Sequence, residues 1–169
     1  GGSDRSQYRN REDLTYEQAM AIQEYAVHVQ AVGVENWDWG NEITFRDRKT
    51  TQPISVAGAT PEFALANGYF VDYGRFLTES DILHTRNVAV IGVDVVEDLF
   101  PFEDPIGAQV KIRGRPFTVV GIFEERGASF GESRDNRAVI PYSTWEKMYG
   151  SDRSVNITVR AASTAEYTE

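Results

Sequence analysis

The 169-residue chain contains no cysteine, which excludes disulfide bonds, zinc–thiolate sites and cysteine nucleophiles. Basic residues are also scarce, with 17 Lys and Arg against 26 Asp and Glu and a net charge of -9. A duplex-binding protein needs a basic surface to displace counterions from phosphates, and an anionic membrane surface attracts basic segments. We therefore expect no nucleic-acid partner and no docking on an anionic membrane surface.

Long apolar runs are missing as well, and none approaches the roughly 20 residues that a membrane-spanning helix needs. There is no signal peptide at the start, and "GGSDRS" resembles the edge of a loop. We expect either a cytosolic protein or a water-exposed piece of a longer one. No phosphate-binding loop of the form G-x-x-x-x-G-K-[ST] occurs, so the chain does not itself bind ATP in that way.

What the chain does have is 41% hydrophobic and 12% aromatic residues, enough for a core in one domain or two small subdomains. Thr15 and Gln18 form a capping-box pattern that predicts the start of a helix. From Val27 the apolar period changes to two, which is typical of strands. Apolar segments with turn signals between them predict further strands at residues 42–47, 53–59, 86–93, 108–113, 116–123, 138–141 and 155–161.

Between these strands the pattern predicts short helices and loops. Thr60, Asp94 and Ser143 are the expected N-caps of three helices, the last two with a glutamate three residues on. Residues 48–52 are expected to form a turn, and residues 68–81 and 124–137 to form loops. Gly114 and Arg115 are expected to form a type II′ hairpin turn. The sum is an α+β fold with an antiparallel or mixed sheet.

Catalytic signatures are weak. Residues 127–131, "GASFG", fit the nucleophile-elbow pattern around Ser129, but no helical pattern follows, and both histidines, His28 and His84, precede the serine. We interpret the segment as a glycine-rich loop. The two histidines are also too far apart to form a recognisable metal site, and Arg75 is expected to make a local salt bridge.

Trp37 and Trp39 alternate across Asp38, so both rings are expected on one side of a strand. Such a pair is either the inner face of a sheet or the lining of an apolar ligand groove. Both interpretations stay open on the sequence alone. Together with Ser129, Phe130 and Arg134 of the long loop, the two tryptophans are the candidate partner or substrate contacts.

Three segments, read in order, resemble a known family. They are "GRFLTESD", "NVAVIGVDVVEDLFPFEDPIGAQVKIRGRPFTVVGIFEERGASFG" and "DNRAVIPYSTWEKMYG". Their order and spacing resemble the extracytoplasmic core domain of MacB-like, FtsX-family ABC transporter permeases. The resemblance covers about residues 14–160 and is strongest over residues 87–121.

The resemblance implies a porter-like α+β subdomain with an inserted Sabre-like mixed β subdomain that carries short helices. Residues 1–58 and 151–169 would form the porter-like part, expected to be incomplete, and residues 59–150 the Sabre-like part. It also implies an inner-membrane protein whose periplasmic or extracellular domain is this chain, with a membrane helix before residue 1 and further chain beyond residue 169.

By the same resemblance, this domain is not an enzyme and binds no cofactor or metal. ATP and magnesium would be bound by a cytoplasmic nucleotide-binding domain or subunit, and the domain would couple ATP hydrolysis to substrate export or to mechanotransmission. The implied partners are a second permease copy, that ATPase and an external adaptor or outer-membrane duct. Two alternatives remain: a secreted ligand-binding module that uses Trp37, Trp39 and residues 124–137, and a hydrolase that uses Ser129.

Overall fold

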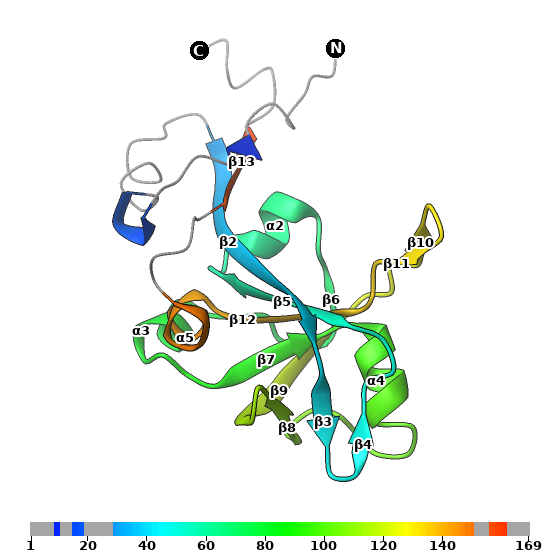
Figure 1. Ribbon diagram of the computed structural model, residues 1–169. Helices are drawn as coiled ribbons and strands as arrows, with labels where there is room; N and C mark the ends of the chain where they lie inside the picture. The colour runs from blue at the N-terminus through cyan, green and yellow to red at the C-terminus, as the bar shows by residue number, and fades with distance from the viewer. Residues whose placement is uncertain (1–8, 11–14, 19–28, 151–155, 162–169) are drawn as a thin grey trace.

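The computed structural model describes residues 9–10, 15–18, 29–150 and 156–161. Most strands belong to one 11-stranded sheet in the order β1-β13-β2-β5-β12-β7-β9-β8-β3-β4, with β6 beside β9 (Figure 1). The strands of this sheet are β1 (Arg9–Asn10), β2 (Val29–Asn41), β3 (Ile43–Phe45), β4 (Arg48–Lys49), β5 (Ile54–Ala59), β6 (Val71–Gly74), β7 (Val88–Ile91), β8 (Gln109–Ile112), β9 (Arg115–Phe123), β12 (Arg137–Pro141) and β13 (Asn156–Ala161). The helices with assigned bounds are α2 (Phe63–Asn67), α3 (Glu79–Leu83), α4 (Val93–Leu99) and α5 (Tyr142–Tyr149).

The sheet is mixed, which confirms the predicted α+β class. β12 runs parallel to β5, and β7 runs parallel to β9, whereas the remaining pairs are antiparallel. All residues of β5 and β7 are buried, because layers cover both faces of these central strands. β9 instead alternates buried and half-buried positions from Phe117 to Phe123, so one of its faces is covered less than the other.

The sheet buries two apolar clusters. The larger cluster includes Trp145 of α5 and Leu99 of α4, and the smaller one is built around Phe63 and Tyr69. Gly58 of β5 lets α5 lie directly on the sheet, because a Cβ at this position would sit 2.2 Å from the Cβ of Trp145. No helix in the described ranges is long and apolar enough to cross a membrane.

The predicted subdomain boundary at residues 58 and 59 falls inside β5. This strand pairs on one side with β2, from the first predicted part, and on the other with β12, from the second. A continuous ladder of hydrogen bonds therefore crosses the boundary. The division into porter-like and Sabre-like parts stays a prediction.

Two of the predicted helix caps are wrong. The N-cap of α4 is Gly92, and Asp94 lies in the first turn, where its carboxylate accepts a hydrogen bond from Ser133 at 2.6 Å. α5 begins at Tyr142, and the Ser143 hydroxyl donates to the carbonyl of Ile82 on α3 at 2.6 Å. Both side chains have the chemistry of a cap but are used for contacts between distant segments, which local patterns do not reveal.

Other capping patterns hold. The Thr15–Gln18 capping box is present in both directions, with N···O distances of 3.1 and 3.2 Å; the rest of that helix lies outside the described residues. The third predicted cap is displaced: the helix after Thr60 is present but begins only at Phe63, so Thr60 is not its N-cap. A second capping box, between Thr78 and Asp81, starts α3 inside the segment that was expected to be a loop.

Three turns differ from their predictions. The β8–β9 turn is Arg113–Gly114, with φ of 51° and 77°, so it is of type I′ rather than type II′ at Gly114 and Arg115. Residues 48–49 form β4 instead of part of a turn, because the chain already reverses at residues 46–47. The expected loop at residues 68–81 contains β6 as well as α3. Strands of two to four residues leave too little periodicity to be recognised.

The predicted local salt bridge of Arg75 is confirmed. Its guanidinium lies 2.8 Å from the carboxylate of Asp81, and Gly74 before it has a φ of 76°. Arg86 approaches the same carboxylate at 3.2 Å from the other side. The fully buried Asp81 thus ties the segment before α3 to the segment after it.

Candidate functional site

Residues 124–137, expected to be a structureless loop, form a small hairpin that projects from the body of the sheet (Figure 1). Its strands are β10 (Ala128–Ser129) and β11 (Glu132–Ser133), paired with each other as a separate two-stranded sheet. Phe130 and Gly131 form the turn, with φ of 53° and 81°. A left-handed conformation is unfavourable for a bulky residue, so the backbone holds the Phe130 ring out at some conformational cost.

Buried polar groups hold the base of this hairpin. The carboxylate of Asp135 accepts hydrogen bonds from the backbone N–H groups of Arg126 at 2.7 Å and Gly127 at 2.8 Å. The N–H of Arg134 donates to the carbonyl of Gly127 at 2.8 Å. The N–H of Asp135 also donates to the Ser133 hydroxyl, which in turn bonds to α4 through Asp94. The base is fixed to the body, whereas the Phe130 ring is fully exposed at the tip.

Ser129 and Arg134 occupy different parts of this hairpin. Ser129 is half-buried in β10, and Nη2 of Arg134 donates to the carbonyl of Arg126 at 3.1 Å. A nucleophile elbow needs a sharp turn from a strand into a helix, whereas residues 127–131 turn from strand to strand. The interpretation of "GASFG" as something other than an elbow therefore agrees with its backbone.

The two tryptophans lie on one side of β2, as predicted. One of them fits the interpretation as an inner sheet face, and the other fits the interpretation as a contact surface. Their rings stack with centroids 6.0 Å apart. Trp37 is half-buried and packs toward Phe63 of the smaller cluster, with centroids 6.1 Å apart. Trp39 is 72% exposed. Trp37 is therefore part of the core, and Trp39 is the member of the pair that is available for contact.

A chain of ring contacts connects the tryptophans to the hairpin base. Arg137, the first residue of β12, lies 5.5 Å from the Trp37 ring centroid and 5.6 Å from that of Tyr69. Arg126 covers the Tyr69 ring at 4.0 Å. The tryptophans of β2 and the base of the β10–β11 hairpin are thus connected through Arg137, Tyr69 and Arg126.

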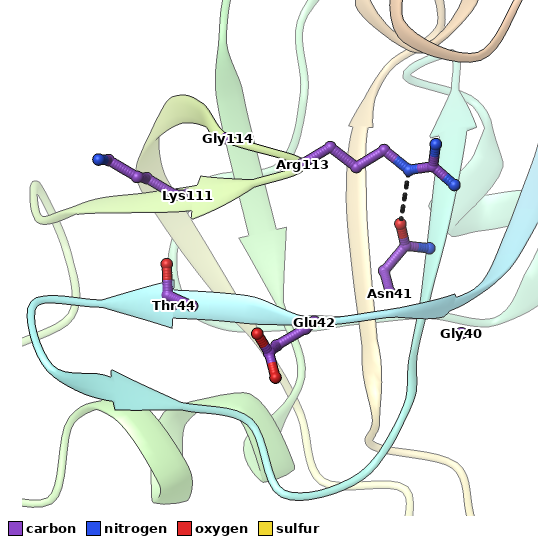
Figure 2. A pocket seen from close by; sticks show the side chains of 7 residues that line it. All are labelled: Gly40, Asn41, Glu42, Thr44, Lys111, Arg113 and Gly114. Carbon is purple, nitrogen blue, oxygen red and sulfur yellow. Dashed lines mark hydrogen bonds between the residues drawn. The ribbon is translucent and has the colours of Figure 1, made fainter.

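An open depression of about 320 Å³ lies between the β2–β3 connection and the β8–β9 turn (Figure 2). Figure 2 shows Arg113 reaching across to Asn41, where Nε of Arg113 donates to the side-chain oxygen at 3.3 Å. The guanidinium also donates to Asp38 at 3.0 Å and stacks over Tyr149 at 4.7 Å. Tyr149 donates to Asn41 in turn, at 2.9 Å.

This network clamps the β8–β9 turn against β2 and the end of α5. The side-chain amide of Asn41 donates to Asp38 and to the carbonyl of Ile54, so all its polar atoms are used by the protein itself. We interpret the depression as the outer side of a structural clamp. Sequence reasoning missed it because Arg113 is 72 residues from Asn41, and no local signal joins the two.

No group of three or more His, Asp or Glu side chains in the described ranges is arranged to hold a metal ion. That the domain binds no cofactor or metal remains a prediction, since the chain outside these ranges also carries acidic residues and His28.

Comparison with known proteins gives a consistent result. The family model described as "MacB-like periplasmic core domain" matches residues 1–169. The macrolide export ATP-binding/permease protein MacB of Rhodospirillum rubrum is 35% identical over 104 residues, which are 60% of this chain and 16% of that protein. The pyoverdine export ATP-binding/permease protein PvdT of Pseudomonas aeruginosa is 33% identical over 125 residues, 73% of this chain and 19% of that protein.

Two solved structures share the fold. The extracellular domain of the noncanonical ABC-type transporter YknZ from Gram-positive bacteria has a TM-score of 0.74 and 20% identity, and the match covers 94% of this chain and 79% of that one. The periplasmic region of MacB from Actinobacillus actinomycetemcomitans has a TM-score of 0.73 and 21% identity, with coverage of 93% and 72%. The chain spans less than a quarter of the length of the two export proteins.

Proposed function

The chain belongs to the MacB-like periplasmic core domain family, and from this premise we propose that it is the extracytoplasmic part of an ABC transporter permease. Its relatives MacB and PvdT are ATP-binding/permease proteins, and the two matching structures are external domains of transporters. In this proposal ATP and magnesium bind to a cytoplasmic nucleotide-binding domain, either fused or separate. The domain itself forms no bonds in a substrate.

The proposed task of the domain is to carry movement from the membrane helices to an external partner. The single large sheet supports this task, because its hydrogen-bond ladder runs from β1 to β4 without a break. The Arg113–Asn41 clamp joins two segments that are distant along the chain. The ion pairs of the buried Asp81 join the segments on either side of α3. A body joined in this way moves as a unit, so a displacement at the membrane end reaches the outer surface. Two permease copies would bring two such bodies together or apart.

The observation that carries the contact proposal is the Phe130 side chain. It is fully exposed on a hairpin whose base is fixed by Asp135. Exposed aromatic residues are frequent anchors of protein interfaces, and a pre-ordered element loses little conformational entropy on binding. We infer that the β10–β11 hairpin inserts Phe130 into an apolar pocket of an external adaptor.

Replacing Phe130 with alanine in the full-length transporter is expected to weaken adaptor binding about tenfold, a change of about 1.4 kcal/mol. Phe130 makes no core contact, so the stability of the domain should stay the same. Phe102→Ala is the matched control, because that ring is 87% exposed but lies in the loop after α4. Surface plasmon resonance with the immobilised transporter measures the adaptor affinity of both variants. Equal affinities of the Phe130→Ala variant and the unmodified protein would exclude the hairpin as the contact.

A further inference from the structure

Two unusual polar atoms of the described chain lie at the hairpin base and on Tyr69, whose ring contacts that base. Within the described ranges, the buried side-chain polar atoms without a hydrogen-bond partner are the hydroxyl of Tyr69 and Nε of Arg134. A buried donor without a partner is costly, and native structures usually supply one from protein, water or an ion. Both atoms belong to side chains that contact Arg126. The Arg126 guanidinium stacks on Tyr69, and the guanidinium of Arg134 donates to the backbone carbonyl of Arg126.

Positive charge accumulates at the same place. The guanidinium of Arg126 lies 4.0 Å from the Tyr69 ring centroid, and Arg134 is close enough to act on its charge. Burial and the neighbouring charge of Arg134 lower the pKa of Arg126, against a smaller opposite effect of Asp135. Like charges in a partly buried site repel each other, so this arrangement is unfavourable without a neutralising group.

Residues 29–150 do not supply a full counter-charge to these arginines. No ion pair within residues 29–150 joins Arg126 or Arg134 to a carboxylate. The nearest buried carboxylate, Asp135, already accepts the backbone N–H groups of Arg126 and Gly127. The shortage of carboxylates is limited to this place, because the chain as a whole has 26 acidic and 17 basic residues.

We propose that Arg126, Arg134 and Tyr69 form a binding site for an oxyanion, such as a carboxylate or a phosphate group. Guanidinium groups suit these ligands because their planar N–H donors match two oxygens at once. The oxyanion would accept from Nε of Arg134 and from the Tyr69 hydroxyl, and it would neutralise Arg126. This site is separate from the proposed transport function. It can be tested on the 169-residue chain alone, without the rest of a transporter.

The test is an NMR titration of the 169-residue chain with inorganic phosphate and, separately, with sodium acetate, at constant ionic strength. We expect the backbone amide signals of Gly127 and Arg134 to shift saturably. Arg126→Gln and Arg134→Gln should each weaken the binding about tenfold or more, because a charge-assisted hydrogen bond or a neutralised charge is lost. Tyr69→Phe should weaken it by a smaller factor, since the ring that supports Arg126 stays in place.

Arg46→Gln is the control, because Arg46 is an exposed arginine at the distant β3–β4 turn, and it should bind like the unmodified chain. Preference for acetate would identify the natural group as a carboxylate, and preference for phosphate would identify a phosphate group; either supports the site. Arg134→Gln also removes a hairpin hydrogen bond, so the Arg126 and Tyr69 variants decide the result if that variant is disordered. Unsaturable shifts that are the same in all variants would overturn the proposal.

Discussion

Replacing Trp145 with alanine is expected to lower the free energy of unfolding by about 3–5 kcal/mol, the usual range for removing a large buried aromatic side chain. Trp145 is completely buried in the larger cluster, and its indole N–H donates to the carbonyl of Val56 at 3.0 Å. Gly58 lies against the indole and has no side chain of its own to fill the space that the ring would leave. The substitution leaves a void and removes the hydrogen bond from the indole to Val56.

Urea unfolding of the isolated chain measures this effect, and Trp39→Ala is the matched control. Trp39 is 72% exposed, so its removal should change the free energy of unfolding by no more than about 0.5 kcal/mol. Trp145→Phe should lie between the two, because it keeps part of the ring volume and loses the hydrogen bond. A loss below about 1 kcal/mol for Trp145→Ala would mean that α5 does not pack on β5 in the way described.

Replacing Asp81 with alanine is expected to cost about 2 kcal/mol at neutral pH, after allowance for solvent around its half-exposed arginine partners. Burial alone would raise the pKa of Asp81, but hydrogen bonds from Arg75, Thr78 and Arg86 outweigh it and lower the pKa to about 2. The folded protein therefore favours the ionised form more strongly than the unfolded chain does.

The sign of the pH dependence follows from this lowered pKa. The stabilisation by Asp81 is fully present above the pKa of an unfolded aspartate, about 3.9, and is lost as the pH falls toward about 2. The difference in unfolding free energy between the unmodified chain and Asp81→Ala should thus be constant from pH 7 to about pH 5 and shrink below it. Urea unfolding at several pH values checks this, with the exposed Asp72→Ala as control. A difference that grows on acidification would contradict the assignment.

The sequence predicts well those parts of the fold whose causes are local. β5 and β7 are apolar runs because both their faces are buried. The Thr15–Gln18 capping box and the stacked tryptophans on one side of β2 follow from spacings of three and two residues. The α+β class followed from the sum of these local patterns, and the family resemblance implied the same class.

What sequence reasoning missed depends on distant partners. Asp94 and Ser143 have the chemistry of helix caps, yet they are hydrogen-bonded to Ser133 and Ile82. The β10–β11 hairpin consists of two-residue strands that carry no period, and its order comes from the carboxylate of Asp135. The subdomain boundary and the contact roles of Trp37, Trp39, Ser129, Phe130 and Arg134 remain predictions.

The central claim is that this domain moves as a rigid body when the transporter binds ATP. The chain has no cysteine, so a single Lys111→Cys substitution on β8 gives one spin-label site per copy once cysteines elsewhere in the full-length protein are replaced. Double electron–electron resonance between the two copies then measures their separation with and without trapped ATP. The account predicts that the main distance shifts by more than the width of its distribution while that width stays the same. Identical distributions in the two states would contradict it.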